Sequence, residues 1–276
     1  MTGADVLPAA TAYLDSHVAV ITLNRSSTGN RLNPELLSAL AALLEQDAAG
    51  EETRAILLRS NGPAFCHGMD LGVLRASGWD RSRIEETIDL YCSLLHRIYT
   101  FPKPVVAVIR GEVKAGGVGL AAAADYLIGT ETASFELAEV FFGVLPANVL
   151  PFLQGLRLSP GRARAMILSA RKLNAAEALD LGLLDEVHPD DHLEKKTKEL
   201  FKRLLMFSPS ALEATKKLTL RLSGINLPAL LKLTKHTLVD LLMNKKTQEG
   251  IEAFLEGGLP PWAGRFRPEH PLIVRE

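Results

Sequence analysis

Cysteine is scarce in this chain, because only Cys66 and Cys92 occur among its 276 residues. A disulfide framework needs more cysteines, so the sequence predicts a protein of a reducing compartment, and we expect a cytoplasmic location. Two cysteines do not supply a metal-ligand cluster either, and we expect no metal site. Cys66 has no recognisable base beside it, so the sequence does not indicate a cysteine nucleophile.

Long apolar runs and an excess of one charge sign are also missing. The longest apolar stretch, residues 118–128, is shorter than the about 18 residues of a membrane-spanning helix, and Asp125 interrupts it. Met1 to Ala12 shows no basic region followed by an apolar one, so we expect no signal peptide. Lys and Arg number 31 against 32 Asp and Glu, so net charge does not favour a nucleic acid or an acidic membrane as partner.

The first half of the chain alternates apolar β-branched runs with segments of helical periodicity. Such an order is typical of an α/β fold with a mostly parallel sheet, and continuous apolar strands indicate a sheet covered on both faces. The predicted strands are 18–24, 54–60, 104–110 and 125–129, and the predicted helices are 34–49 and 81–100.

The second half is predicted to be helical almost throughout. Ser208-Pro209 and the stretch from Ser223 to Pro228 interrupt it, as turn residues do. The predicted helices are 160–170, 174–182, 190–206, 210–222 and 228–256.

Three segments of the chain carry residues suited to chemistry. In 65–71 (FCHGMDL) and 111–120 (GEVKAGGVGL), glycines allow backbone N–H groups to approach a ligand closely, although turns and tight packing also use them. In 134–146 (SFELAEVFFGVLP), Glu136 and Glu139 stand among apolar residues, where a carboxylate can act as an acid or a base. Capping or solvent exposure of one of them is the alternative interpretation.

In their order along the chain, these segments resemble the enoyl-CoA hydratase/isomerase (crotonase) superfamily. FCHGMDL is similar to the family's F-x-A-G-x-D-L loop, and AGGVGLAAAAD to its G-G-G-x-x-L-A-x-x-C-D segment. Further similar stretches are 24–36 (NRSSTGNRLNPEL), 169–187 (SARKLNAAEALDLGLLDEV) and 249–254 (EGIEAF).

The resemblance implies a fold and an assembly. We expect the crotonase (ClpP/crotonase-like) ββα spiral core with the active site in residues 1–200, and a helical C-terminal trimerisation region in residues 201–276. A homotrimer or a dimer of trimers is the expected assembly. No cofactor is expected beyond the CoA or phosphopantetheine group that carries the acyl thioester.

The resemblance also assigns roles to residues. The thioester oxygen would lie between the backbone N–H groups of Met69 and Gly116, an oxyanion hole that stabilises an enolate. Glu139 matches the second of the two catalytic glutamates of hydratases, whereas Gly119 stands where the first would be. Asp70 is expected to hold its loop by hydrogen bonds.

The segment that follows Glu139, FFGVLPANVLPFLQGL, departs from ordinary hydratases and resembles the dehydratases of polyketide β-branching cassettes. This finer resemblance implies a lyase that converts 3-hydroxy-3-methylglutaryl on an acyl carrier protein (ACP) to 3-methylglutaconyl-ACP, with Glu139 as the single base. The alternative is a CoA-dependent enoyl-CoA hydratase or a Δ3,Δ2-enoyl-CoA isomerase, which also manages with one glutamate. A non-catalytic family member is the third interpretation, and the retained glycines and Glu139 oppose it.

Four further polar residues are candidates for substrate contact. His67 and Asn148 are the first two, each with a structural role as the alternative. Lys114 is interpreted as solvated rather than bound to a substrate carboxylate, and Arg31 as a residue near the thioester tail that favours a carrier protein over free CoA. The resemblance places two aromatic residues, Tyr91 and Tyr99, on a helix near the acyl pocket, and both are interpreted as packing.

Overall fold

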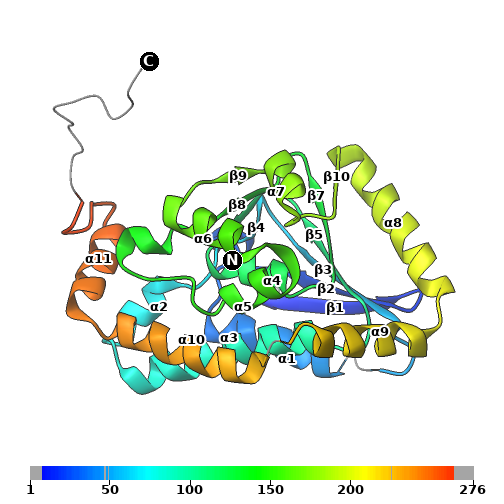
Figure 1. Cartoon of the computed structure of the whole chain (residues 1–276), viewed down its shortest axis with the longest axis horizontal. Coiled ribbons are helices and arrows are strands. Elements are labelled where there is room, and N and C mark those ends of the chain that lie inside the picture. Colours follow the sequence, from blue (N-terminus) through cyan, green and yellow to red (C-terminus); the bar gives the residue numbers. More distant parts are fainter. Residues whose placement is uncertain (1–7, 47, 49, 225, 264–276) are drawn as a thin grey trace, which may run out of the picture.

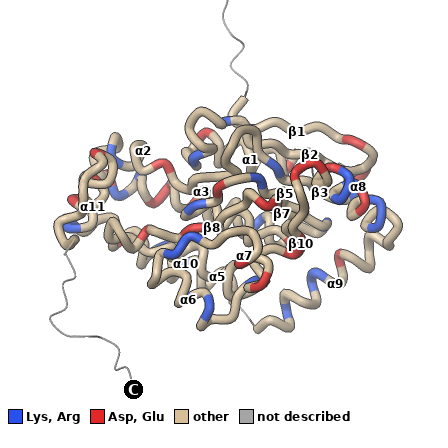
Figure 2. Tube along the Cα trace, turned by 90° about the horizontal axis from the view of Figure 1, so that it is seen from above, with Lys and Arg blue, Asp and Glu red and all other residues tan. Residues whose placement is uncertain are grey.

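The computed structural model describes residues 8–46, 48, 50–224 and 226–263 (Figure 1). Residues 1–7 of the N-terminal stretch and 264–276 of the predicted C-terminal region lie outside the described residues. Among those that are described, no helix is long and apolar enough to span a bilayer. Lys and Arg are interspersed with Asp and Glu along the trace, most visibly on the helix labelled α8 (Figure 2).

A six-stranded sheet with the order β1-β2-β3-β5-β7-β10 forms the centre of the molecule. Only β1 is antiparallel to its neighbour, so the predicted parallel sheet is confirmed for the other five strands. The strands are β1 (Ala10–Asp15), β2 (Val18–Leu23), β3 (Ala55–Ser60), β5 (Val105–Ile109), β7 (Tyr126–Thr130) and β10 (Glu186–His188).

The edge strand β1 was not predicted from the sequence, because it has no apolar run. Its outer residues are exposed, including Tyr13 and Leu14. The turn into β2 places both Ser16 and His17 at positive φ, 48° and 70°. A tight two-residue hairpin turn that matches the twist of its strands requires positive φ at both central residues. Glycine and asparagine are the residues usually found at these two positions.

A second, four-stranded sheet lies beside the first, with the order β4-β6-β8-β9. Three of its strands each follow directly after a strand of the large sheet, and these three run parallel to one another. Each of these three consecutive strand pairs therefore contributes one strand to each sheet, which confirms the predicted ββα spiral. The strands are β4 (Ala64–Cys66), β6 (Glu112–Lys114), β8 (Ser134–Glu136) and β9 (Leu173–Asn174).

Helices cover both faces of the large sheet. Along β2, Val18 and Val20 pack with Leu193 and Phe201 of α8 (Asp190–Met206), whereas Ile21 faces the main core on the opposite side. This double coverage explains why the strands read as continuous apolar runs. On the main-core side lie α1 (Pro34–Gln46), α2 (Leu71–Ala76), α3 (Arg81–Thr100), α4 (Gly116–Ala122) and the short η2 (Glu139–Phe142). The short η1 (Ser26–Thr28) follows β2 and has no buried residue.

The C-terminal part of the chain is helical, as predicted. One prediction was wrong: 228–256 is not a single helix but two, α10 (Leu227–Leu242) and α11 (Lys245–Leu255). Asn244 separates them because its side chain accepts a hydrogen bond from Lys246 N at 2.9 Å and caps the second helix. The preceding elements are α5 (Leu150–Phe152), η3 (Leu153–Arg157), α6 (Pro160–Ser169), α7 (Ala175–Leu181) and α9 (Pro209–Leu222).

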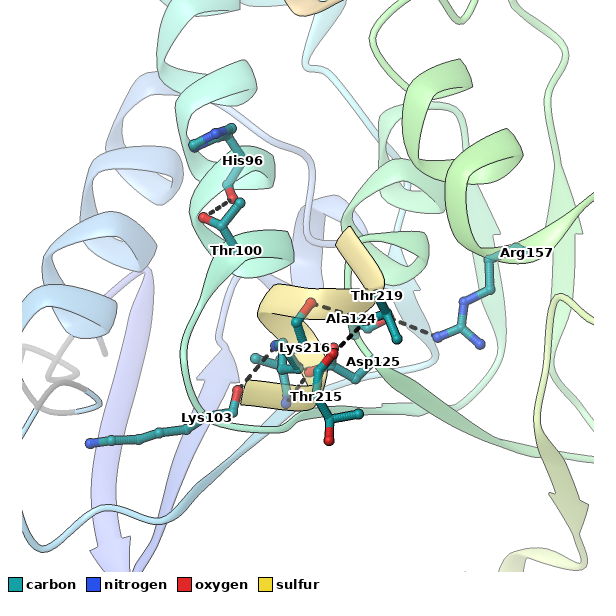
Figure 3. Close-up of polar contacts among 10 residues, drawn as sticks. His96, Thr100, Lys103, Ala124, Asp125, Arg157, Thr215, Lys216 and Thr219 are labelled. Carbon is teal, nitrogen blue, oxygen red and sulfur yellow. Dashed lines mark hydrogen bonds and ion pairs between the residues drawn. The ribbon is translucent and has the colours of Figure 1, made fainter. Parts of the chain in front are cut away.

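An ion pair attaches α9 to the core. Lys216 Nζ lies 2.6 Å from Asp125 Oδ2 and also donates to the carbonyl oxygen of Lys103 at 3.1 Å (Figure 3). Asp125 Oδ2 accepts a further hydrogen bond from Val105 N at 2.7 Å. Because α9 has no buried residue of its own, this pair is a principal link between that helix and the sheet.

We expect Lys216→Met to lower the free energy of unfolding by about 2 kcal/mol, because it leaves the Asp125 carboxylate without its partner. The matched control is Lys217→Met on the same helix. Lys217 pairs with Glu213 in solvent, so its loss should change stability by less than about 0.5 kcal/mol. Urea unfolding of both variants measures the difference, and equal stabilities would show that the Lys216–Asp125 pair does not anchor α9.

Candidate active site

The first candidate donor is the N–H group of Met69, in the loop between β4 and α2. Leu32 N donates to the carbonyl oxygen of Gly68 at 2.8 Å, and Asp70 N donates to the carbonyl oxygen of Leu32 at 2.9 Å. In this parallel bridge the backbone groups that flank Met69 bind Leu32, so the N–H of Met69 itself points to the other side. The Asp70 side chain accepts from Gly72 N at 3.2 Å and caps α2, which is the structural role predicted for it.

The second candidate donor is the N–H group of Gly116, the first residue of α4. The first N–H groups of a helix have no partner within it. The sequence predicts a glycine-rich loop over 111–119, but β6 occupies part of this stretch and the helix already begins at Gly116. Ala115, directly before it, has a φ of 50°, an uncommon value for a residue with a Cβ atom.

Two glycines allow the two donor loops to touch. A Cβ atom on Gly68, whose φ is 77°, would lie 2.7 Å from Gly116 N. A Cβ atom on Gly117 would collide with the carbonyl group of Cys66. Glycine at these positions therefore allows the loop that carries Met69 and the start of α4 at Gly116 to approach each other closely, as two donors for one oxygen require.

Glu139 begins η2, just after β8, and only 7% of its surface is exposed. Its Oε2 is buried and has no hydrogen-bond partner among the described residues. Burial is the main cause that raises the pKa of Glu139 to about 7, and the nearby charge of Glu136 adds to it. A carboxyl group with this pKa is available in both protonation states near neutral pH, as proton transfer requires.

Met69, Gly116 and Glu139 line one cavity of about 340 Å³. Much of its wall is apolar, and the C-terminal helices contribute a part of it, including Leu238 of α10 and Phe254 of α11. Phe254 packs against Phe142 with ring centroids 4.9 Å apart. The structure thus brings the three predicted site residues together, and the helical region covers its own active site.

Tyr91 contributes to the site, which the sequence did not predict. Its hydroxyl group donates to the carbonyl oxygen of Gly116 at 2.6 Å, and the residue is buried in the cavity wall. A Cβ atom on Gly119 would collide with this hydroxyl group and lie 3.1 Å from Val149 Cγ2. Tyr91 and Val149 therefore occupy the space that a glutamate side chain at position 119 would need. Tyr99, by contrast, packs edge-on against Phe152, as predicted for a core residue.

The cationic residues lie near one another at the cavity. His67 Nε2 is 3.2 Å from Glu112 Oε2, and Lys114 Nζ is 2.8 Å from the same oxygen. Hydrogen bonds from Lys114 and from Lys172, whose Nζ lies 2.7 Å from Glu112 Oε1, hold the pKa of Glu112 down at about 2. Arg31 also lines the cavity and is exposed. Lys114 thus has an ion-pair partner, whereas His67 Nε2 lies near Glu112 but makes no hydrogen bond among the described residues.

Asn148 lies in the segment between η2 and α5, is 2% exposed and lines the same cavity. In the part of the chain that the structure describes, neither its Oδ1 nor its Nδ2 has a hydrogen-bond partner. Cys66 is also buried, and burial raises the pKa of its thiol to about 12. A thiol with this pKa stays protonated at neutral pH, in agreement with the sequence-based conclusion that it is no nucleophile.

Comparison with known proteins identifies the class. The profile of the enoyl-CoA hydratase/isomerase family matches residues 14–265, so the chain belongs to this family and is an enzyme of the crotonase superfamily. A probable enoyl-CoA hydratase of Rhodobacter capsulatus is 34% identical over 248 residues, which cover 90% of this chain and 95% of the relative.

Two further comparisons agree with this membership. The 2,3-dehydroadipyl-CoA hydratase of Escherichia coli is 29% identical over 250 residues, 90% of this chain and 96% of that protein. The crystal structure of an enoyl-CoA hydratase from Mycobacterium avium superposes with a TM-score of 0.83 at 27% identity, covering 92% of this chain and 99% of the other. The match extends over the spiral core and into the helical C-terminal region.

Proposed function

We propose that this enzyme is an enoyl-CoA hydratase or isomerase that forms a thioester enolate and moves protons through one carboxylate, Glu139. The observation that supports this proposal most is that Glu139 is buried in the cavity that Met69 and Gly116 also line. Its Oε2 has no hydrogen-bond partner among the residues that the structure describes. The relatives described above are named for CoA thioesters, which supports CoA as the carrier.

In this proposal the thioester oxygen accepts hydrogen bonds from the N–H groups of Met69 and Gly116. These donors stabilise the negative charge that develops when Cα loses its proton. Ionised Glu139 takes that proton and returns it at Cα, at Cγ or to a departing hydroxyl group. The residues alone can perform these transfers, so the proposed mechanism requires no resident cofactor.

A mechanism with two carboxylates has no support in the cavity. Gly119 carries no side chain, and Tyr91 and Val149 occupy the adjacent space. Burial raises the pKa of Tyr91 well above its usual value, so its phenol stays neutral and donates to Gly116. Tyr91 is therefore better placed to hold the Gly116 backbone than to act as a second base.

The proposal predicts that the wild-type enzyme exchanges the α-protons of butyryl-CoA for deuterium in D₂O. Butyryl-CoA has neither a double bond nor a hydroxyl group, so the exchange reports only enolate formation. Proton NMR of the Cα resonance follows it, with Glu139→Gln as the control that should not exchange. If neither butyryl-CoA nor crotonyl-CoA acquires deuterium with the wild-type enzyme, the proposed function is wrong.

A second candidate is the dehydration of 3-hydroxy-3-methylglutaryl-ACP in polyketide β-branching. The missing carboxylate at Gly119 and the divergent segment after Glu139 favour it, because a tertiary hydroxyl group leaves readily with help from one acid. None of the relatives described above is named for a carrier protein. Incubation with the acylated carrier protein would give a mass loss of about 18 Da, one water, if this candidate is correct.

Assembly and location belong to the same proposal. Exposed leucines on α9 and α10, among them Leu218, Leu222 and Leu233, support a role of residues 201–276 in forming a homotrimer or a dimer of trimers. The reduced cysteines support a cytoplasmic location.

A further inference from the structure

Asn148 is an unusual residue for the wall of an apolar cavity. Burying an amide without a hydrogen-bond partner costs about 1–3 kcal/mol, so an unsatisfied amide in a folded protein calls for an explanation. Both of its polar atoms lack a partner among the described residues, and so does Oε2 of Glu139 in the same cavity. A ligand with a group that can both donate and accept hydrogen bonds would satisfy them.

The position of Asn148 is informative because of its neighbour. Val149 Cγ2 lies 3.1 Å from the place where a Cβ atom of residue 119 would be. The segment that carries Asn148 therefore approaches the space that the first glutamate of two-carboxylate hydratases would use. The segment that carries Asn148 follows η2 in the chain, whereas Gly119 lies on α4.

We propose that Asn148 is a catalytic residue that binds an oxygen atom on Cβ of the acyl chain, in place of the carboxylate absent at position 119. This inference rests on the proposed function, because it assumes an acyl thioester in the cavity. It selects a substrate class, namely 3-hydroxyacyl and 2-enoyl thioesters, over enoyl chains that only shift a double bond. A hydroxyl group or a water molecule at Cβ accepts from Asn148 Nδ2 and donates to Glu139.

The elimination balances with these residues alone. Glu139 takes the proton from Cα, and the C–H electron pair forms the enolate and then the Cα–Cβ double bond. The Cβ–O bond breaks, and the departing oxygen takes the proton back from Glu139 and leaves as water. Asn148 Nδ2 donates a hydrogen bond to that oxygen as it gains negative charge, and the reverse sequence adds water to the 2-enoyl thioester.

The decisive variant is Asn148→Leu, which has a side chain of similar size without polar atoms. Dehydration of 3-hydroxybutyryl-CoA should fall by about 10²-fold, the cost of one lost donor to a developing charge. Deuterium exchange into butyryl-CoA should stay within about 3-fold of wild type, because that reaction has no Cβ oxygen. Loss of both activities together, or retention of both, would overturn the role of Asn148.

Binding provides a second measurement, in the Glu139→Gln background, where turnover is expected to be slower by about 10³-fold or more. Calorimetry should show about tenfold tighter binding of 3-hydroxybutyryl-CoA than of butyryl-CoA, the contribution of one hydrogen bond. Adding Asn148→Leu should remove this preference and leave butyryl-CoA affinity unchanged, which also shows that the variant folds. A preference that persists would refute the inference, whereas absence of exchange in the wild-type enzyme would instead refute the proposed function.

Discussion

Replacing Glu139 by glutamine is expected to lower turnover of enoyl-CoA substrates by about 10³-fold or more, because the remaining amide cannot accept the α-proton. The side chain keeps its size, so the cavity and the backbone donors stay in place. Steady-state kinetics with crotonyl-CoA, together with a binding measurement for butyryl-CoA, separates loss of chemistry from loss of binding. A variant that binds butyryl-CoA normally and retains more than about a tenth of the wild-type rate would exclude Glu139 as the base.

The pH dependence of the wild-type enzyme follows from the same group. Burial raises the pKa of Glu139 to about 7, and the ionised form is the one that abstracts the proton. The rate in either direction should therefore rise as pH increases through about 7 and level off above it, since Glu139 is regenerated as a carboxylate in each cycle.

Stability should change in the opposite sense to activity. Because the pKa of Glu139 is raised in the folded state from its ordinary 4.5 to about 7, ionisation destabilises the fold as pH rises across that interval. Glutamine does not ionise, so Glu139→Gln should be more stable than wild type by about 3 kcal/mol at pH 8, and by less than about 1 kcal/mol at pH 5. Urea unfolding at the two pH values measures the difference in stability between the variant and the wild type. An equal gain in stability at both pH values would show that ionisation of Glu139 is not its cause.

The second large effect concerns a backbone donor rather than a side chain. Gly116→Pro removes the N–H group at the first position of α4, where the φ value of proline is compatible with a helix. Without this donor, kcat/KM should fall by about 10²–10³-fold, and the loss should affect every substrate because it concerns the shared enolate.

Gly116→Ala is the matched control. It keeps the N–H group but adds the Cβ atom, which would lie 3.2 Å from the Tyr91 hydroxyl oxygen and 3.6 Å from Leu32 Cδ1. This crowding should cost activity less than the loss of the donor does. If alanine and proline lower kcat/KM equally, the defect is steric and the N–H group of Gly116 does not bind the thioester oxygen.

Sequence reasoning predicted the four central strands of the large sheet because they are buried on both faces, but it missed the two edge strands, β1 and β10, which are less buried. Val18 and Val20 pack on one side and Ile21 on the other, so hydrophobicity alone marks the strand. The short strands of the second sheet have only two or three residues each and give no periodic signal. The break between α10 and α11 at Asn244 was missed because apolar residues occur on both sides of it, Leu242 before and Ile251 after.

By itself, the sequence determined the α/β class, the family resemblance and the candidate residues Met69, Gly116 and Glu139. Ordered motifs carry this information because glycine, aspartate and glutamate at fixed spacings are local features of the chain.

Only the tertiary structure decided how distant residues share one cavity. Tyr91 fills the space over Gly119, the C-terminal helices complete the wall, and Asn148 lines the same cavity as Glu139 without a hydrogen-bond partner among the described residues. These relations join residues far apart along the chain, and burial, which raises the pKa of Glu139, is a property of the packed fold. Local sequence patterns do not contain that information, because contact and desolvation arise only when the segments pack together.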